Sequence, residues 1–276
     1  MKFFHTVSLT DGLELSFGSF ETEFDFEDSN LFGVLITDPR ILRNIGEFYF
    51  ERNYFKRAIE VFTQLSNADE SAELYEKTAF CYQKLGQFVL ALEYYHKAEL
   101  FDRTKLWNVK KIAYCARKVG DYQKALEYYK LAEKLEPGNL FIQTFLGHTM
   151  MDLEDYEAAL KYYFKVEYNA PDNHKIHRPI AWCSFLLGKF DQAEKYLKKV
   201  IKKEGNRNDF MNLGHVLWCK GNRAEAIDNY RKSIEIAGLD YDWFGDVLSE
   251  DSVHLVKYGI KSFDIPLMVD YLRLGS

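Results

Sequence analysis

Long apolar runs are missing from this 276-residue sequence. None approaches the roughly 20 residues that a helix needs to cross a bilayer. Asp11 and Glu14 interrupt the stretch after Met1 that a secretory signal would require to be apolar. We therefore expect no membrane insertion and a cytoplasmic location.

The motifs of common enzyme classes are also missing. There is no GxSxG, GxxxxGKS/T, GxGxxG or HExxH motif and no CxxC pair, so no pattern positions a nucleophile, cradles a phosphate or holds zinc. His174 and His177 are three residues apart, but no cysteine or carboxylate stands at ligand spacing from them, and we interpret them as a surface pair. We expect no enzyme activity, no cofactor and no metal.

Strong positive charge is absent as well. The net charge is −6, and residues 1–38 carry eight acidic residues against one basic residue, which leaves +1 for the rest. Proteins that bind nucleic acid through phosphate contacts have a basic stripe, and this sequence has none. We expect no nucleic-acid partner.

What the sequence does contain is a repeated pattern with a period of 33 or 34 residues. An alanine within each copy is preceded twelve residues earlier by another small residue and followed four residues later by a large apolar one. The alanines are Ala58, Ala91, Ala125, Ala159, Ala193 and Ala226; the small residues are Gly46, Ala79, Ala113, Gly147, Ala181 and Gly214; the large ones are Phe62, Tyr95, Tyr129, Tyr163, Leu197 and Tyr230.

These three sets of aligned positions, which we call columns, predict a pair of antiparallel helices in each copy. Two helices approach closely where small side chains face each other, and bulky residues one turn away fill the flanking space. Turn glycines stand between the helices at Gly86, Gly120, Gly188 and Gly221. Pro137 and Pro171 are expected to end second helices, and Pro179 to kink a first helix.

The period and its columns resemble the tetratricopeptide repeat. The resemblance implies an all-α, right-handed superhelix of about six helix-turn-helix repeats, at 39–71, 72–105, 106–139, 140–173, 174–206 and 207–239. More narrowly, the stretches at 99–122, 161–197 and 264–273 resemble the C-terminal part of long, uncharacterised bacterial tetratricopeptide-repeat proteins, and this resemblance implies no known activity. Cys81, Cys115 and Cys183 share one repeat position and Cys219 lies outside it; neighbouring first helices are too far apart for disulfides, so we expect buried, reduced thiols.

The two ends depart from the repeat. Residues 240–276 are helical in pattern and predict a cap for the exposed apolar end of the stack, formed by Trp243, Phe244, Val247, Leu248, Leu255, Leu267, Met268 and Leu272. Residues 1–38 form an acidic, aromatic segment. Residues 6–17 alternate in polarity around Asp11 and Gly12, which is typical of a short β-hairpin, docked or mobile.

The resemblance also implies where a partner would bind, because first helices line the concave groove in this family. The corresponding positions here are rich in aromatic and basic residues, which suits a binding hot spot. The candidate residues are Trp107, Lys110, Tyr114, Arg117, Phe141, His148, Lys175, Arg178, Trp182 and Trp218. Aromatic residues at some of these positions can instead pack against the next repeat.

We therefore predict a non-catalytic scaffold that binds a protein or peptide with apolar and acidic residues. Residues 20–32 alternate phenylalanine with acids, so a second hypothesis is that they occupy the groove of the same or a neighbouring molecule. The alternative function is a regulatory or oligomerising module of a larger enzyme or transport assembly.

Overall fold

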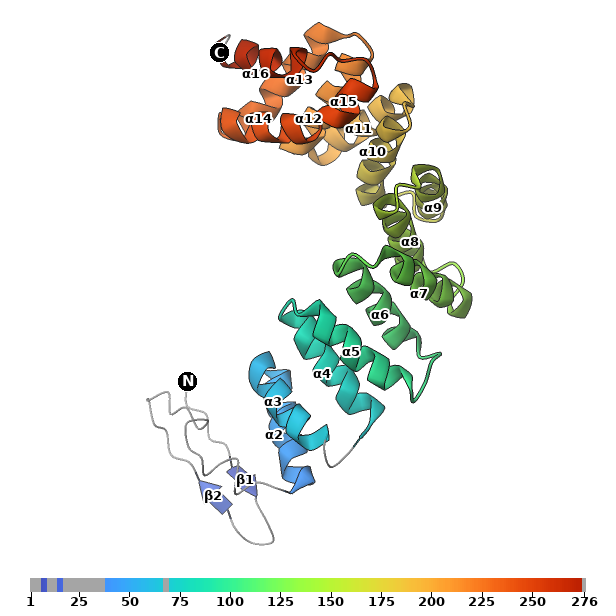
Figure 1. Ribbon diagram of the computed structural model, residues 1–276, viewed down its shortest axis with the longest axis vertical. Helices are drawn as coiled ribbons and strands as arrows, with labels where there is room; N and C mark the ends of the chain where they lie inside the picture. The colour runs from blue at the N-terminus through green and yellow to red at the C-terminus, as the bar shows by residue number, and fades with distance from the viewer. Residues whose placement is uncertain (1–5, 9–13, 17–37, 67–69, 275–276) are drawn as a thin grey trace. The chain divides into compact units, whose positions relative to one another are not determined.

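The computed structural model describes residues 6–8, 14–16, 38–66 and 70–274. They divide into two compact units, unit 1 up to Asp121 and unit 2 from Tyr122 onward, and the division falls in the turn of the third predicted repeat. Unit 1 contains α2 (Pro39–Glu51), α3 (Phe55–Ser66), α4 (Ala72–Lys84), α5 (Phe88–Glu99) and α6 (Leu106–Lys118) (Figure 1).

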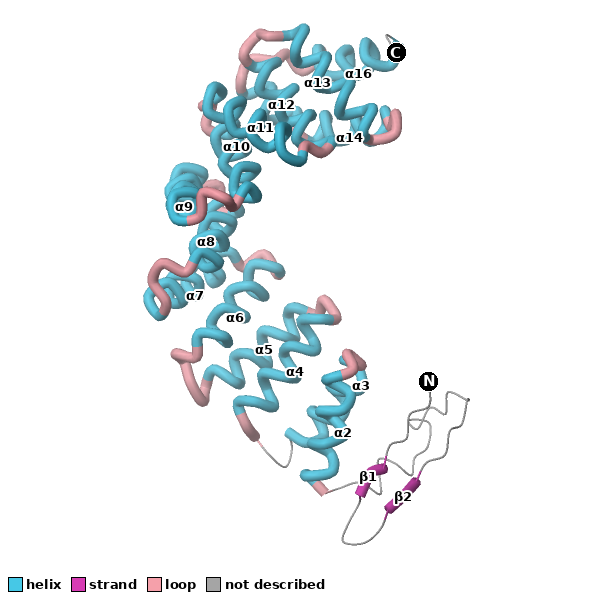
Figure 2. The backbone as a smooth tube through the Cα atoms, turned by 180° about the vertical axis from the view of Figure 1, so that it is seen from behind, coloured by secondary structure: helices cyan, strands magenta, loops and turns pink. Residues whose placement is uncertain are grey.

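Unit 2 continues the same pattern and then departs from it. Its elements are α7 (Tyr122–Leu135), α8 (Leu140–Asp152), α9 (Tyr156–Asn169), the short 3-10 helix η2 (His174–Ile176), α10 (His177–Leu186), α11 (Phe190–Glu204), α12 (Arg207–Cys219), α13 (Arg223–Ile236), α14 (Tyr241–Glu250), α15 (Ser252–Lys257) and α16 (Asp264–Leu274). Helices α2 and α3, α4 and α5, α8 and α9, α10 and α11, and α12 and α13 pack as hairpins, and each hairpin packs on the next within its unit (Figure 2).

The small-residue column lies where the helices of a hairpin come closest. A Cβ atom added at Gly46, Gly147 or Gly214 would overlap the ring of Phe62, Tyr163 or Tyr230, respectively. These three aromatic rings are fully buried. The predicted hairpins and their packing column are confirmed, and at these three glycines the first helix lies too close to the ring for a methyl group, whereas Ala79 and Ala113 occupy the same position in the copies that carry Tyr95 and Tyr129.

A second column sets the turn inside each hairpin. The backbone has a positive φ angle at Gly86, Gly120, Gly188 and Gly221, as the sequence predicted. The first and fourth repeats place Asn53 (φ 62°) and Glu154 (φ 61°) at the equivalent position. The turn geometry is therefore retained even where a side chain makes it less favourable.

The fifth repeat differs from the expectation for its first helix. Pro179 is the third residue of α10, and η2 precedes that helix. The first turn of a helix has N–H groups without intrahelical acceptors, so a proline fits there without breaking a bond. The predicted kink inside the helix is wrong, because the helix begins at the proline's own turn.

Three-residue strands β1 (Thr6–Ser8) and β2 (Glu14–Ser16) pair antiparallel, with Val7 opposite Leu15. They lie on either side of Asp11 and Gly12, in the segment whose alternation predicts a hairpin. The acidic aromatic residues 20–32 lie outside the described residues. Self-association through them stays a prediction.

Gly147→Ala should destabilise the protein by about 1 to 3 kcal/mol, because the added methyl group overlaps the Tyr163 ring in a closely packed core. Gly245→Ala is the matched control. Gly245 is also helical, but its added Cβ would stand 3.7 Å from the nearest atom, of Val269, so we expect no loss or a gain of up to about 1 kcal/mol. Urea unfolding measures both; equal losses would contradict this account of the column.

Candidate functional site

We call the surface formed by α2, α4 and α6 in unit 1, and that formed by α8, α10 and α12 in unit 2, the first-helix face of each unit. In unit 1 its side chains touch from helix to helix. The rings of Phe50 and Phe80 lie 5.7 Å apart between centroids, and Lys111 Nζ lies 5.0 Å from the Phe80 centroid and 5.4 Å from that of Trp107. Three consecutive first helices thus share an aromatic ladder with a lysine inside it.

The ladder is cationic and partly open. Trp107 is 39% exposed, and its ring also packs against that of Tyr95. Burial lowers the pKa of Lys111 from its ordinary value. A cation held against aromatic faces, with little water around it, attracts a carboxylate more strongly than a solvated lysine does.

The remaining candidates in unit 1 lie on α6, the same helix as Trp107. Lys110, Tyr114 and Arg117 are half-buried. The Tyr114 ring packs against Phe88 of α5, with centroids 6.1 Å apart. Tyr114 therefore belongs partly to the packing between repeats, the interpretation that the sequence left open.

The unit 2 face begins with aromatic residues on α8. Phe141 is 50% exposed and lies 4.5 Å from Phe145 between ring centroids. His148 follows, 5.7 Å from Phe145, and its Nδ1 lies 2.7 Å from the hydroxyl of the core residue Tyr163. The Tyr163 hydroxyl thus holds the imidazole of His148 in a set orientation.

Two contributors to the face were missed by the sequence analysis. Lys111 and Phe145 each stand four residues after a predicted aromatic residue, Trp107 and Phe141, and contact it. Residues four apart on a helix are neighbours on its surface. That spacing was the available signal.

Arg178 of α10 has a structural partner. Its guanidinium donates to both carboxylate oxygens of Asp209, at 2.9 Å each, and to the backbone carbonyl of Glu204 at 2.9 Å. Asp209 is 3% exposed and its carboxylate also accepts from the Asn206 backbone N–H, in the box that begins α12. Arg178 therefore joins two repeats, whereas its neighbour Lys175 is exposed.

Trp182 and Trp218 differ from the expectation of an open groove. Trp182 is half-buried and packs edge-on against His254 of α15, with centroids 5.8 Å apart. Trp218 is 4% exposed and packs against Tyr230. Trp218 is consequently part of the core of unit 2 and is almost entirely buried.

The histidine pair is also placed differently from the surface interpretation. His177 is 5% exposed, and its Nε2 lies 3.2 Å from Oε1 of Glu167. Burial lowers the pKa of His177, the Lys199 charge lowers it further, and Glu167 opposes both. No group of three or more possible metal ligands occurs among the described residues.

Burial also affects the four cysteine thiols. Cys81, Cys115 and Cys183 are buried and Cys219 is half-buried, and all are free. Burial raises the pKa of each thiol to about 12. Thiolate, the reactive form, is therefore scarce at neutral pH.

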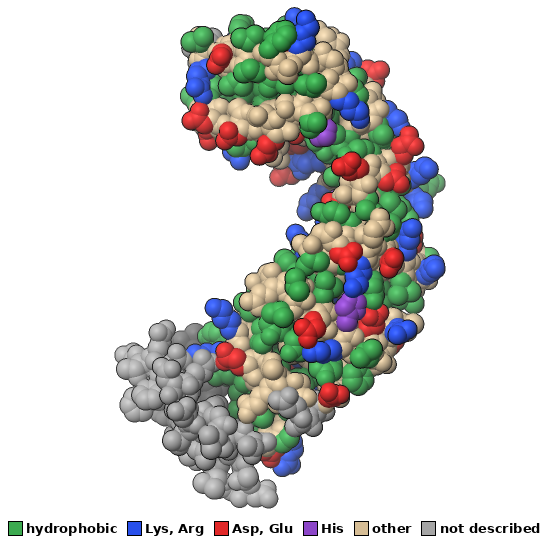
Figure 3. Space-filling view, viewed as in Figure 1, with side chains coloured by type: hydrophobic (Ala, Val, Ile, Leu, Met, Phe, Trp, Pro, Cys, Tyr) green, Lys and Arg blue, Asp and Glu red, His purple; other side chains and the backbone are tan. Residues whose placement is uncertain are grey.

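Charges are interspersed along the repeats. On the face shown in Figure 3, acidic and basic side chains alternate with apolar ones over both units. No helix among the described residues is long and apolar enough to cross a membrane. The geometry offers partly open aromatic and basic surfaces on the first helices.

The comparisons with known proteins agree with this architecture. Residues 111–139 and 210–238 match one model of the tetratricopeptide repeat, and residues 180–206 match another. No curated protein matches the chain.

Solved structures share the fold at low identity. The C-terminal part of a tetratricopeptide repeat-containing protein from Cytophaga hutchinsonii has a TM-score of 0.63 and 19% identity, covering 84% of this chain and 92% of that chain. MamA from residue 41 onward, from Desulfovibrio magneticus RS-1, has a TM-score of 0.58 and 17% identity, covering 62% and 98%. YrrB, described as having an unusual peptide-binding site, has a TM-score of 0.54 and 23% identity, covering 65% and 93%.

Arg178→Met should destabilise the protein by about 2 to 4 kcal/mol, because it leaves the buried carboxylate of Asp209 without its counter-charge. The double variant Arg178→Met, Asp209→Asn removes both charges. Its loss of unfolding free energy should be smaller than the sum of the two single losses. Strictly additive losses would show that the pair is not coupled.

The free energy of unfolding should fall as the pH drops below about 6.5, the ordinary pKa of histidine. In that range His177 binds a proton in the unfolded state but stays neutral in the folded state, where burial lowers its pKa. The loss should continue until the pH reaches the lowered folded pKa. His177→Gln should make unfolding free energies measured at pH 7.5 and 5.5 more alike than in the wild type. An unchanged pH dependence would exclude His177 as a contributor.

Proposed function

Because this chain is a tetratricopeptide-repeat protein, we propose that it is a non-catalytic scaffold that binds segments of another protein on its first-helix faces. The aromatic ladder of unit 1 carries the proposal. Phe80, Lys111 and Trp107 come from two neighbouring first helices and present a flat apolar surface with a cation inside it. The peptide-binding site named for YrrB supports a binding role for this fold.

The preferred ligand combines acidic and apolar residues. An aromatic or aliphatic side chain of the ligand would cover the open edge of Trp107, and a carboxylate would approach Lys111. Phe141 of unit 2, which is half exposed beside Phe145, is a second anchor of the same kind. Large rigid rings lose little conformational freedom on binding, which is why they dominate interface energetics.

Arg178 and Trp218 have smaller roles in this proposal than the sequence indicated. Arg178 neutralises Asp209, and Trp218 is buried. Replacing either would weaken the fold and confuse a binding experiment. The variants that test binding should therefore be the partly exposed residues Trp107 and Phe141.

A display library of short peptides should yield ligands rich in acidic and aromatic residues when selected on the wild-type chain. Trp107→Ala and Phe141→Ala should each be measured by fluorescence anisotropy, and we expect at least one to weaken binding by about tenfold or more. Raising the salt concentration should weaken binding too, because the carboxylate contacts are screened.

Tyr168→Ala is the matched control. Tyr168 lies on the second helix α9 and is 86% exposed, so its removal deletes an accessible aromatic ring outside the first-helix face. Binding should change by less than about twofold. Peptides held equally well by both first-helix variants, or a selection that enriches none, would contradict the proposal.

A further inference from the structure

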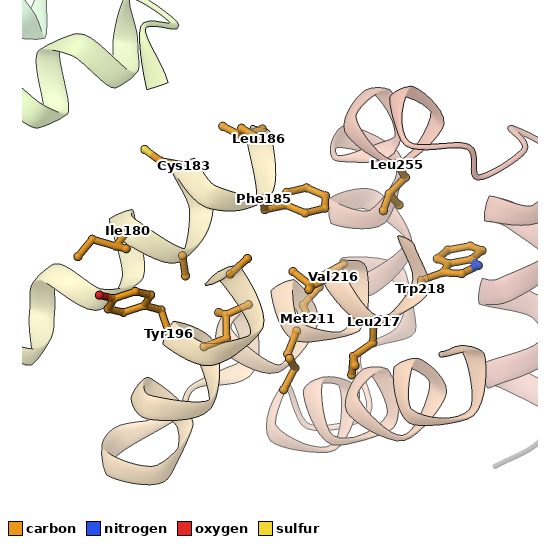
Figure 4. Packing of buried hydrophobic residues seen from close by; sticks show 14 of the residues in the cluster. Ile180, Cys183, Phe185, Leu186, Tyr196, Met211, Val216, Leu217, Trp218 and Leu255 are labelled. Carbon is orange, nitrogen blue, oxygen red and sulfur yellow. The ribbon is translucent and has the colours of Figure 1, made fainter. Parts of the chain in front are cut away.

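The first-helix face of unit 2 is covered at one end by a segment of the same chain. Helix α15 lies against α10 and α12, where His254 packs on Trp182 and Tyr258 packs on Phe185, with ring centroids 5.8 Å apart in both pairs. Leu255 is fully buried among the side chains of this cluster (Figure 4). Trp182 and Phe185 are residues of the first helix α10, and Trp182 is one of the candidate partner-binding residues.

Polar contacts fix both ends of α15. Before its first turn, Asp251 Oδ2 lies 3.1 Å from Nε2 of His215, a fully buried residue of α12. Beyond its last turn, the Tyr258 hydroxyl donates to the backbone carbonyl of Leu186 at 2.6 Å. That carbonyl belongs to the last turn of α10, where the backbone carbonyls receive no hydrogen bond from an N–H group of the same helix.

Helices α10 and α12 thus contact the α15 segment at three places. The contacts are made with the carboxylate of Asp251 before the helix, with the buried Leu255 in its middle and with the hydroxyl of Tyr258 after it. Gly188 leaves room for the Tyr258 ring, since a Cβ added there would stand 3.2 Å from it. The surface is therefore shaped for this pattern of side chains.

Helix α15 is short and partly exposed on its outer side. It has six residues, and Val253 and Val256 on its outer side are 64% and 45% exposed. Gly259, with a φ of 94°, follows it in the turn that leads toward α16. A six-residue helix has no stability of its own, so its place depends on these contacts, and such segments open locally before a core does.

On the premise that the first-helix face is the binding surface, we infer that α15 is a displaceable internal occupant of it. The partner that replaces α15 is an amphipathic helical segment of the same pattern. It has an acidic residue at its start, a leucine four positions later and a tyrosine seven positions later, as in Asp251, Leu255 and Tyr258. Binding of that segment requires α15 to leave the face.

Hydrogen exchange of the full chain, followed by mass spectrometry, tests whether α15 opens. Amides of residues 252–260 should exchange at least tenfold faster than those of α12. Tyr258→Phe removes only the bond to the Leu186 carbonyl, so it should speed exchange of α15 about fivefold and leave α12 unchanged. Tyr271→Phe, at a residue of α16 that is 53% exposed, is the matched control and should alter neither.

A labelled peptide of residues 249–260, SEDSVHLVKYGI, tests replacement. It should bind a Tyr258→Ala chain at least tenfold more tightly than the wild type, and a peptide with Asp251→Asn and Tyr258→Phe should bind more weakly. Two results would overturn the inference. One is that the amides of α15 exchange as slowly as those of α12. The other is that the labelled peptide does not bind a Tyr258→Ala chain that circular dichroism shows to be folded.

Failure here is distinguishable from failure of the proposed function. Library peptides that depend on Trp107 or Phe141 would still be bound if α15 proved a fixed part of the core. If no library peptide binds but the labelled peptide does, the proposed function fails for Trp107 and Phe141, and the binding surface is confined to α10 and α12.

Discussion

Close approach of two helices over a small residue is the constraint on which the rest of this protein depends. The buried tyrosine ring lies directly over Gly147 in one hairpin and over Gly214 in another. Burial of each ring is worth several kcal/mol at ordinary transfer values. A methyl group at either glycine would overlap the ring at the helix spacing of these two hairpins. The other copies have glycine or alanine at this position, so the column is restricted to small residues.

Tyrosines of the large-residue column connect the core to the first helices. The Tyr95 hydroxyl donates to Gln83, and the hydroxyls of Tyr163 and Tyr230 pair with His148 and His215. These first-helix side chains are thus oriented by the packing beneath them. Burial raises the pKa of Tyr230 and so keeps its hydroxyl protonated and able to make this bond.

Polar contacts between neighbouring repeats recur at a nearly constant separation. Glu76 pairs with Lys105, Glu167 accepts from the Tyr196 hydroxyl, and Lys220 pairs with Asp191, each pair 29 residues apart. A separation close to one period joins the helices of one copy to the next copy or, for Lys105, to the residue that directly precedes its first helix α6. Such pairs are individually weak at a surface, but they specify which face of one repeat meets the next.

The structure could be predicted from the sequence where it follows from the repeated local pattern. It could not be predicted where it depends on contacts with residues outside the same copy of the repeat. The helix pairs and the packing column occur in all six copies and the turn glycine in four of them, so each copy supports the others. The burial of Trp218 depends on C-terminal helices that have no repeat, and that of His177 on Glu167 in the preceding hairpin. Neither partner could be inferred from spacing within one copy.

First-helix side chains consequently differ in exposure within unit 2. Phe141 on α8 is half exposed, whereas Phe185 on α10 and Trp218 on α12 are buried. Part of this burial comes from the chain that follows the repeats, since Tyr258 packs on Phe185 and Asp251 Oδ2 lies 3.1 Å from Nε2 of His215 on α12. An aperiodic segment therefore covers part of a face that the periodic helices build.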